Sequence, residues 1–418
     1  MPVLNRLLYY YNRILIVVLC VCIIVNDCSP VLPNFDIWSD HENDQQLSSN
    51  LTKLVNNSTT RKSKVLNFFP VPVDDECISN DQRRPGVCLN PYECRIQNGS
   101  PHGQCALGFG VCCIFTAQCG LDVYNNITYI VSPDFPALSR GPINCVHKIK
   151  KIDPEISQIR FDFIHFSVGQ PNRQTGVCDS EILTISGGNN RPLRMCGLNS
   201  GQHVYFDVEN LNEPLTLQMN FSKTNIDRFW EIKVTQIPFD RRAPLGCLQY
   251  NTGTTGIIRT MNFADNGRRL ADQEYTICTR QEAGMCSIVY EPCDENSFRI
   301  GQGIQNQTTN IFDDEGSGGG GIPLFYDEAR MCSDRIVLPC DSEEFLLPGH
   351  VAPGYCDIAH CGASLCPPGE SACRVESSTT PFNIGIQFGP GATSTARMES
   401  PEDNLGMCLK YEQLPCAV

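Results

Sequence analysis

The segments WEIKVTQIP, residues 230–238, and MCLKYEQLP, residues 407–415, carry lysine, glutamine and proline at the same three positions. In the first segment Trp230, Ile232 and Val234 alternate with polar residues, which is the period of a strand with one buried face. Because the two segments lie far apart in the chain, their similarity indicates an internal repeat. The residues that precede each segment support this interpretation.

Four cysteines before each segment occupy comparable places. The first of each set precedes a phenylalanine by sixteen residues, Phe135 and Phe263 respectively, and the fourth of each set precedes a glycine. The sets are Cys119, Cys145, Cys178 and Cys196 in the first copy and Cys247, Cys278, Cys332 and Cys361 in the second. We therefore expect two related modules, at residues 119–239 and 246–416. The second contains twelve cysteines, eight of which the repeat leaves unassigned.

Alternation within both modules predicts an all-β fold. Inward-facing residues are expected to be Leu215, Leu217, Met219 and Phe221 in one strand and Val204, Phe206 and Val208 in another. Tyr205 and Asp207 are then expected on the polar face of the second strand. No convincing amphipathic helix interrupts these strands, so we expect two antiparallel β-sandwich domains of the jelly-roll type.

The cysteine content indicates an oxidising compartment, since the 418 residues include 25 cysteines. Arg6 and Arg13 precede an apolar run over 14–25, which predicts a signal peptide at residues 1–28 and a secreted protein without membrane insertion after its removal. A retained membrane anchor is the alternative, but the run is short of the roughly 20 apolar residues that a span needs. Removal of Cys28 with the signal peptide leaves 22 cysteines, enough for eleven bridges; its retention leaves one odd thiol.

The surface is expected to be glycosylated and acidic. The Asn-x-Ser/Thr sequons are at Asn50, Asn56, Asn57, Asn98, Asn126, Asn220 and Asn306. A formal net charge of −14 disfavours nucleic acid and anionic membrane as partners, because both reward clusters of Lys and Arg.

Two segments precede the repeat. Residues 29–76 are polar and lack cysteine after Cys28, which predicts a disordered linker; a basic group at 61–64 is either a processing site or a solvated patch. Residues 77–115 form a compact cysteine block in which disulfides, more than a core, would hold the chain together. A zinc knuckle is disfavoured because no Cys-x-x-Cys occurs there. The six cysteines are Cys77, Cys88, Cys94, Cys105, Cys112 and Cys113.

The first copy resembles a CUB domain. The resemblance rests on cysteine spacings of 26, 33 and 18, on the aromatic strand of Phe161, Phe163 and Phe166, and on the Cys-Gly pair at the fourth cysteine. It implies disulfides Cys119–Cys145 and Cys178–Cys196 and, in the divergent second copy, Cys247–Cys278 and Cys332–Cys361.

The cysteine block extends the resemblance. Its adjacent last cysteines resemble those of clip-type modules in arthropod haemolymph proteins. The whole arrangement is similar to secreted arthropod CUB domain-containing proteins, and this likeness spans most of residues 77–416.

Many CUB domains bind calcium through acidic residues near one end of the sandwich, where the ion orders loops that hold a basic side chain of a partner. The first copy matches this pattern only at Glu181; the other acidic positions fall near Val168 and Gly169 and near Lys223 and Thr224. Since a hard cation needs several oxygen ligands, we expect no conventional calcium site. Glu181 is then expected to be an exposed strand residue.

No enzyme motif is present. The sequence lacks the serine-hydrolase and zinc-protease signatures, and we expect His165 and His203 to be packed or solvated. The carboxylates Asp162, Asp179 and Glu181 are expected to face solvent, and the glycine run 316–321 is expected to be a flexible loop. We therefore predict no catalytic, metal or cofactor-binding residue.

The expected function is extracellular binding. Two sandwiches would present loops and sheet faces to a protein or glycan partner, with disulfides limiting the entropy lost on binding. The alternatives are a non-catalytic regulatory accessory of an extracellular protease cascade and a structural component of matrix or cuticle.

Overall fold

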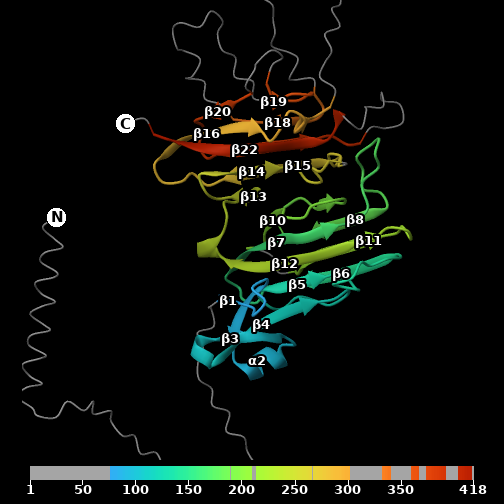
Figure 1. The fold of residues 1–418 in the computed structure, drawn as a ribbon, viewed down its shortest axis with the longest axis vertical. Helices are drawn as coiled ribbons and strands as arrows, with labels where there is room; N and C mark the ends of the chain where they lie inside the picture. The colour runs from blue at the N-terminus through green and yellow to red at the C-terminus, as the bar shows by residue number, and fades with distance from the viewer. Residues whose placement is uncertain are drawn as a thin grey trace, which may run out of the picture. The chain divides into compact units, whose positions relative to one another are not determined.

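The computed structural model describes residues 76–188, 190–209, 213–265, 267–301, 332–339, 359–366, 373–391 and 403–416. The predicted signal peptide, all but the last residue of the predicted linker, and the glycine run 316–321 lie outside them. The described chain consists of strands and connections apart from one six-residue helix and two short 3-10 helices (Figure 1). The predicted all-β class is thus confirmed. No helix within the described ranges is long and apolar enough to cross a membrane.

The small cysteine-rich module opens the described chain. Asn90 caps its helix by accepting a hydrogen bond at Oδ1 from the Tyr92 N–H at 2.8 Å, and Pro91 occupies the first turn, where no intrahelical acceptor is needed. The module consists of β1 (Glu76–Ile78), β2 (Pro85–Leu89), α2 (Pro91–Ile96), β3 (Ser100–Cys105) and β4 (Gly110–Ala117).

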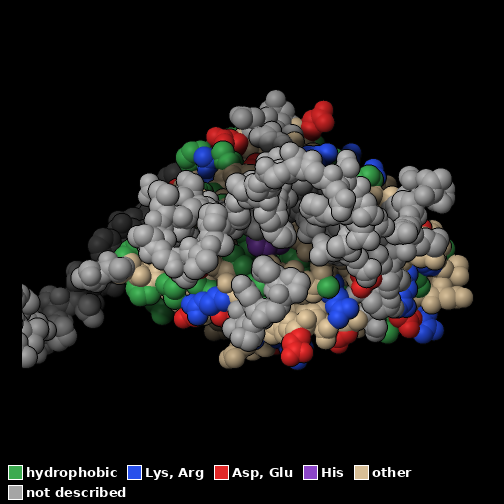
Figure 2. All heavy atoms as spheres, turned by 90° about the horizontal axis from the view of Figure 1, so that it is seen from above, with side chains coloured by type: hydrophobic (Ala, Val, Ile, Leu, Met, Phe, Trp, Pro, Cys, Tyr) green, Lys and Arg blue, Asp and Glu red, His purple; other side chains and the backbone are tan. Residues whose placement is uncertain are grey.

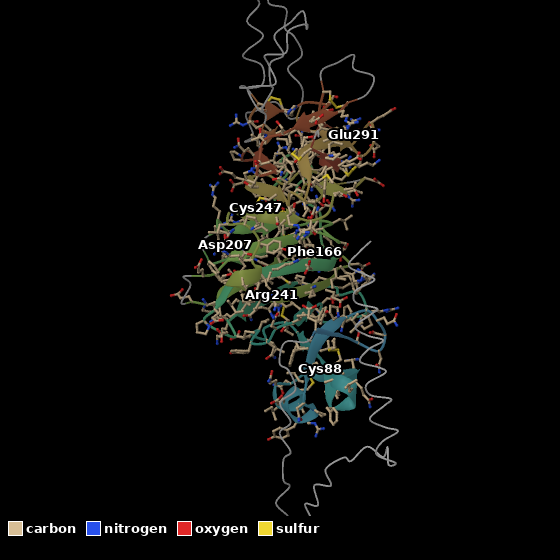
Figure 3. All side chains as sticks on the ribbon, turned by 90° about the vertical axis from the view of Figure 1, so that its left-hand side faces the viewer. Cys88, Phe166, Asp207, Arg241, Cys247 and Glu291 are labelled. Atoms are coloured by element: carbon tan, nitrogen blue, oxygen red, sulfur yellow. A yellow bond between two sulfur atoms is a disulfide. The ribbon has the colours of Figure 1, made fainter. Side chains whose placement is uncertain are left out.

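The first sandwich follows and has two sheets. Aromatic side chains of both sheets are buried in one core: Phe161, Phe163, Phe166 and Trp230 of the larger sheet are at most 1% exposed, as is Phe221 of the smaller sheet. Figure 3 labels Phe166 among the side chains of this sandwich. The larger sheet, in the order β1-β2-β4-β5-β12-β7-β10 with β3 on β4, includes β5 (Thr128–Val131), β7 (Ile156–Ser167), β10 (His203–Asp207) and β12 (Phe229–Pro238). The smaller sheet is β6 (Ile143–Ile149), β11 (Leu215–Phe221), β8 (Glu181–Ser186) and β9 (Leu193–Met195).

The second sandwich repeats this plan with its own core, in which Ile277, Ile384, Ile386 and Leu409 are fully buried. One sheet is β13 (Cys247–Asn251), β15 (Gln273–Thr279), β21 (Asn383–Phe388), β18 (Arg335–Val337) and β19 (Ala359–His360). The other is β14 (Thr255–Arg259), β22 (Gly406–Pro415), β16 (Met285–Pro292) and β20 (Val375–Ser377), with β17 (Phe298–Arg299) also on β22.

A glutamine in the last strand of each sandwich makes the same kind of contact. Gln236 donates from Nε2 to the Lys150 carbonyl at 2.9 Å and accepts at Oε1 from the Ile152 N–H at 2.9 Å. Its amide thereby pairs with one acceptor and one donor of the loop backbone that follows β6. The second sandwich has the same arrangement. Gln413 donates from Nε2 to the Arg280 carbonyl at 2.8 Å and accepts at Oε1 from the Glu282 N–H at 2.9 Å.

Two details of the sheets differ from the expectation. The ladders are antiparallel except that β4 pairs with β5 and β13 pairs with β15 in parallel. In addition, Tyr205 and Asp207 of β10 are only 6% and 8% exposed, so the prediction that they form a polar face was wrong. The reason is that β10 lies against β13 of the second sandwich, which covers its outer side.

The small module is continuous with the first sandwich. β4 passes from one into the other and pairs with β5, with Phe115 opposite Thr128 and Ala117 opposite Ile130. Tyr129, fully buried on β5, donates from its hydroxyl to the Pro85 carbonyl of the small module at 2.8 Å.

An ion pair crosses the same junction. The Arg84 guanidinium lies 2.6 Å from the nearly buried Glu231 carboxylate and 5.1 Å from the centre of the Tyr129 ring. The two units therefore share one sheet and one set of buried polar contacts.

Replacing Tyr129 by Phe tests this junction. The substitution deletes the buried hydrogen bond to Pro85 and should lower the apparent free energy of unfolding by about 1 kcal/mol in urea denaturation. The matched control, Tyr92→Phe on the exposed side of α2, should change it by less than about 0.5 kcal/mol. Equal effects of the two substitutions would contradict the shared junction.

Candidate functional site

All twenty cysteines in the described ranges are joined in disulfides. The structure brings together the four pairs of the repeat, Cys119–Cys145, Cys178–Cys196, Cys247–Cys278 and Cys332–Cys361. In the small module the pairs are Cys77–Cys112, Cys88–Cys105 and Cys94–Cys113. The second sandwich adds Cys286–Cys416, Cys293–Cys408 and Cys366–Cys373, which the repeat could not assign. Figure 3 places Cys88 in the small module and Cys247 in the second sandwich.

The described sequons differ in their surroundings. Asn98 and Asn220 are exposed, and Asn220 lies on the outer face of β11. The Asn126 amide is instead paired with β12, because Nδ2 donates to the Gln236 carbonyl at 3.1 Å and Oδ1 accepts from the Gln236 N–H at 2.8 Å. Asn50, Asn56, Asn57 and Asn306 lie outside the described residues.

Glu181 corrects one expectation, since its side chain is fully buried and not exposed. It forms a two-pronged ion pair with Arg228, in which Nε donates to Oε2 at 2.6 Å and Nη2 donates to Oε1 at 2.7 Å. The Arg228 side chain is also fully buried. The sequence offered no signal for this pair because its members lie 47 residues apart, Glu181 at the start of β8 and Arg228 immediately before β12.

The remaining donors of Arg228 bind loop carbonyls. Nη1 donates to Gly141 O at 2.7 Å and to Ile226 O at 3.4 Å, and Nη2 donates to Lys223 O. The Lys223 N–H in turn donates to Glu181 Oε1 at 3.1 Å. All five N–H groups of the guanidinium thus meet oxygen, and they tie together the loops on either side of Glu181.

The second sandwich has a corresponding pair. Arg269 and Asp334 form an ion pair with side chains that are each 5% exposed, and Asp334 Oδ1 also accepts from the Gly389 N–H at 2.7 Å. Arg269 Nε donates to Asn404 Oδ1 at 3.0 Å, in the connection before β22. The carboxylate again follows the third cysteine of its copy, here Cys332.

The two guanidiniums occupy equivalent places although they come from different loops. Arg228 lies 5.5 Å from the ring centre of Phe221, the last residue of β11, and Arg269 lies 5.4 Å from that of Phe388, the last residue of β21. We call each buried arginine–carboxylate pair with the carbonyls and loops it joins a loop junction.

The loop junctions do not provide a calcium site. At each junction, the carboxylate that follows the third cysteine is already bound to a guanidinium. A side chain at Gly169 has no room, since a Cβ there would lie 2.4 Å from Glu181 Cγ. Across the described ranges, no three His, Cys, Asp or Glu side chains converge as a metal site would require.

The other residues weighed for chemistry are dispersed. Asp162 lies on β7 between Arg160 and Lys233, at 2.6 and 3.3 Å. The His165 side chain is 53% exposed and its Nε2 lies 4.0 Å from Glu231. His203 is packed where the two sandwiches meet.

Asn262 connects the two sandwiches. It has a left-handed backbone with φ of 61° and is fully buried. Its Oδ1 accepts from the Leu198 N–H at 2.8 Å, its N–H donates to Asn199 Oδ1 at 2.8 Å, and its Nδ2 donates to Gln170 Oε1 at 2.9 Å. One residue of the second sandwich therefore fills a socket of polar groups in the first.

His203 also lies in the contact between the two sandwiches. Its Nε2 lies 3.0 Å from the Tyr250 carbonyl oxygen and 3.1 Å from the Tyr250 nitrogen. Burial, reinforced by the charge of Arg160, lowers the pKa of His203 to about 4. The imidazole is therefore neutral at physiological pH.

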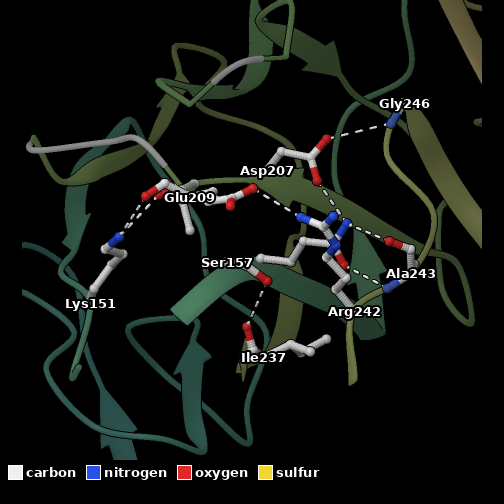
Figure 4. A network of polar contacts seen from close by, with 10 residues as sticks. Lys151, Ser157, Asp207, Glu209, Ile237, Arg242, Ala243 and Gly246 are labelled. Carbon is white, nitrogen blue, oxygen red and sulfur yellow. Dashed lines mark hydrogen bonds and ion pairs between the residues drawn. The ribbon is translucent and has the colours of Figure 1, made fainter. Parts of the chain in front are cut away.

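The segment that connects the two sandwiches is hydrogen-bonded to the first one. Buried Gln158 exchanges two hydrogen bonds with the Ala243 backbone, at 2.8 and 3.0 Å, and its Nε2 also donates to Asp207 at 2.7 Å. Figure 4 shows Ala243 and Asp207, the two partners of Gln158, near the ion pair of Arg242 with Glu209, at 2.9 Å.

Two shallow grooves lie on the outer surface. One is lined by Phe239, which is 55% exposed, together with Pro154, Glu155, Ile156, Ser157, Glu209, Pro238 and Asp240. The other crosses β14, β22 and β16 beside Ile257, which is 50% exposed, and includes Glu291, Lys410 and Glu412. In Figure 2, several described Lys and Arg side chains lie beside Asp and Glu side chains.

Comparison with known sequences identifies one segment. Residues 244–414 match the animal CUB domain family, and the chain therefore contains a CUB domain. The matched segment is the second, cysteine-rich copy. No curated protein sequence matches the chain.

Solved structures show distant likeness. The CUB1-EGF-CUB2 region of human MASP-1/3 is 14% identical, with 69% of this chain and 100% of that chain covered and a TM-score of 0.22. The MASP-1 CUB2 domain bound to Ca2+ is 13% identical over 28% of this chain and 98% of its own, with a TM-score of 0.23. The full extracellular region of zebrafish Gpr126/Adgrg6 is 10% identical, with 70% of this chain and 36% of that chain covered and a TM-score of 0.25.

Asn262 allows the contact between the sandwiches to be tested. Asn262→Gly retains the left-handed backbone but removes the amide, and should lower the apparent free energy of unfolding by about 2 kcal/mol because buried donors and acceptors lose partners. Asn262→Ala should cost roughly a further 1 kcal/mol through backbone strain. Urea denaturation measures both, and a neutral Asn262→Gly would contradict the socket.

His203 predicts a pH dependence. Since its pKa is about 4 in the fold and near 6.5 when unfolded, the unfolded chain binds more protons between these values. The histidine should therefore cost on the order of 2 kcal/mol of stability as pH falls from 6.5 to 4. Comparison with His203→Gln isolates this effect from that of His147, whose pKa burial also lowers. The same pH slope in both proteins would disprove the assignment.

Proposed function

We propose that the chain is a secreted, non-catalytic binding or scaffold protein that recognises an extracellular protein or glycan through its CUB-type sandwiches. The match of residues 244–414 to the animal CUB domain family carries this proposal, because such domains are generally binding modules. The ten disulfides of the described residues support an oxidising, extracellular setting. The proposal includes the signal peptide at 1–28, the module boundaries at 77–115, 119–239 and 246–416, and a likeness to arthropod proteins.

Rigidity supports binding at surfaces that stay exposed. The small module, the first sandwich and the second sandwich are joined by β4, by Tyr129 and by the socket around Asn262. A partner would lose little conformational entropy in ordering such surfaces. The grooves beside Phe239 and Ile257 offer apolar area with flanking carboxylates, and we assign partner contact to one of them.

Glycosylation restricts the choice of surface. Asn220 lies exposed in the middle strand of the smaller sheet of the first sandwich, beside β6 and β8. A glycan there would cover the outer face of that sheet. Partner binding is therefore assigned to the groove surfaces and not to this face.

The regulatory alternative places the active surface on the small module. There α2 exposes Tyr92 and Ile96, which lie one turn apart on the same side. The other alternative, a structural role in matrix or cuticle, is favoured by no single surface of the described residues. It predicts that the protein is extracted only with reductant.

Cross-linking mass spectrometry on the native secreted protein tests the proposal. Partners from the extracellular fluid should be cross-linked near one groove, and their affinity for the purified full chain should fall at least tenfold in Phe239→Ser or Ile257→Ser. The matched control is Val146→Ser, which changes a partly exposed apolar residue on the Asn220 face.

Three outcomes would redirect the assignment. Loss of binding in Tyr92→Ser, with the groove variants unaffected, would favour the protease-cascade alternative. Extraction only with reductant would favour the matrix alternative. Absence of any saturable partner for the soluble full chain would refute the binding function.

A further inference from the structure

We propose that each sandwich orders its loops with an internal cation, the guanidinium of Arg228 or Arg269, in the role that calcium has in many CUB domains. Binding by this protein would then be independent of calcium. The inference concerns how the loops within each sandwich are held in place, and it does not depend on which partner the sandwiches bind.

The coordination of Arg228 supports this role. Its guanidinium is enclosed by the Glu181 carboxylate and by the carbonyls of Gly141, Lys223 and Ile226, and its side chain has no exposed surface. Carboxylate and carbonyl oxygens are the ligands that a hard cation prefers. Here the same kind of oxygen shell surrounds a side chain of the protein itself.

The backbone of Arg228 strengthens the link between loops. Its N–H donates to the Ser139 carbonyl at 3.0 Å and its carbonyl accepts from the Ser139 N–H at 2.8 Å. The arginine therefore joins the connection between β5 and β6, the start of β8 and the connection between β11 and β12. A metal ion at this end would have the same three segments to hold.

The second sandwich has the same arrangement, but its arginine belongs to a different connection between strands. Arg269 lies in the connection between β14 and β15, and its N–H donates to the Asn404 carbonyl in the connection before β22 at 2.9 Å. In the first sandwich the arginine belongs to the connection before the last strand, and in the second it belongs to the earlier connection. Two independent placements of an arginine over the equivalent phenylalanines, Phe221 and Phe388, indicate that the position requires a positive charge.

A divalent ion has no place while the arginines are present. Calcium at either loop junction would have to displace the guanidinium, leaving a positive side chain buried next to the ion. No side chain fits at Gly169 to add a second carboxylate, because the space is filled by Glu181 and Ile226.

Hydrogen–deuterium exchange of the full secreted chain, in millimolar calcium and in EDTA, tests the inference. The loop segments 139–141 and 222–228 of the first sandwich, and 267–270 and 403–406 of the second, should exchange at the same rate in both solutions, and the thermal midpoint should not move. A tenfold slowing of exchange in these segments by calcium, or a midpoint raised by several degrees, would overturn the inference.

Variants test the role of the guanidinium itself. Arg228→Met should speed exchange at 139–141 and 222–228 at least tenfold, because a buried carboxylate is left without a counterion. The matched control is Arg140→Met, which removes an exposed arginine paired with Asp227 at the same end of the sandwich; it should change exchange less than twofold. Equal effects of the two variants would overturn the inference.

A conservative variant covers the case in which Arg228→Met does not fold. Arg228→Lys keeps the positive charge but has three donors and no planar fork. It should be secreted, with exchange at 222–228 between the rates of the wild type and of a destabilised loop. Wild-type exchange in Arg228→Lys would show that bidentate binding is not needed and would overturn the assigned geometry.

Discussion

The part of the larger sheet that belongs to the first sandwich runs from β5 through β12 and β7 to β10, and both of its outer strands must be covered. The rest of the structure depends on this constraint. β5 is buried along its whole length, and β10 is buried on both faces except at His203. A bare edge of this kind would leave unpaired backbone groups and apolar side chains in water. The small module covers one side through β4, and the second sandwich covers the other through β13.

This coverage explains why units with separate cysteine frameworks form a continuous body. The disulfides among the described residues stay within their own unit, so they do not join one unit to the next. The connections between units are backbone pairing and buried polar contacts, such as Tyr129 with Pro85 and Asn262 with Asn199. Bridges thus stabilise each unit, while the orientation of neighbouring units follows from the contacts between them.

Charge serves different purposes in different places. Exposed pairs such as Arg140 with Asp227 contribute little, because water screens them. The pairs at the loop junctions are buried, and their value lies in specifying one arrangement of loops, since any other arrangement leaves a charge unpaired. The acidic net charge of the chain therefore says little about these sites, which are locally neutral.

Much of the fold could be predicted from the sequence because a strand has a local signal, the alternation of apolar and polar residues. Alternation placed β11 at Leu215–Phe221, and the shared glutamine and proline aligned β12 with β22. Alternation predicted that Tyr205 and Asp207 lie on a polar face, but both are buried. Their burial depends on a neighbouring module, so no local pattern in the sequence indicates it. The pairing of Cys286 with Cys416, across 130 residues, likewise follows from which strands become neighbours.

The sequence by itself determined the strand periods and the recurring cysteine positions, since these depend on residues close together or on spacing that recurs. The tertiary structure alone decided that Glu181 is buried and that Arg228, 47 residues away, neutralises it. A carboxylate has the same appearance in a sequence whether it faces water or a guanidinium. Only the folded chain brings the distant charge to it and so decides whether burial is possible.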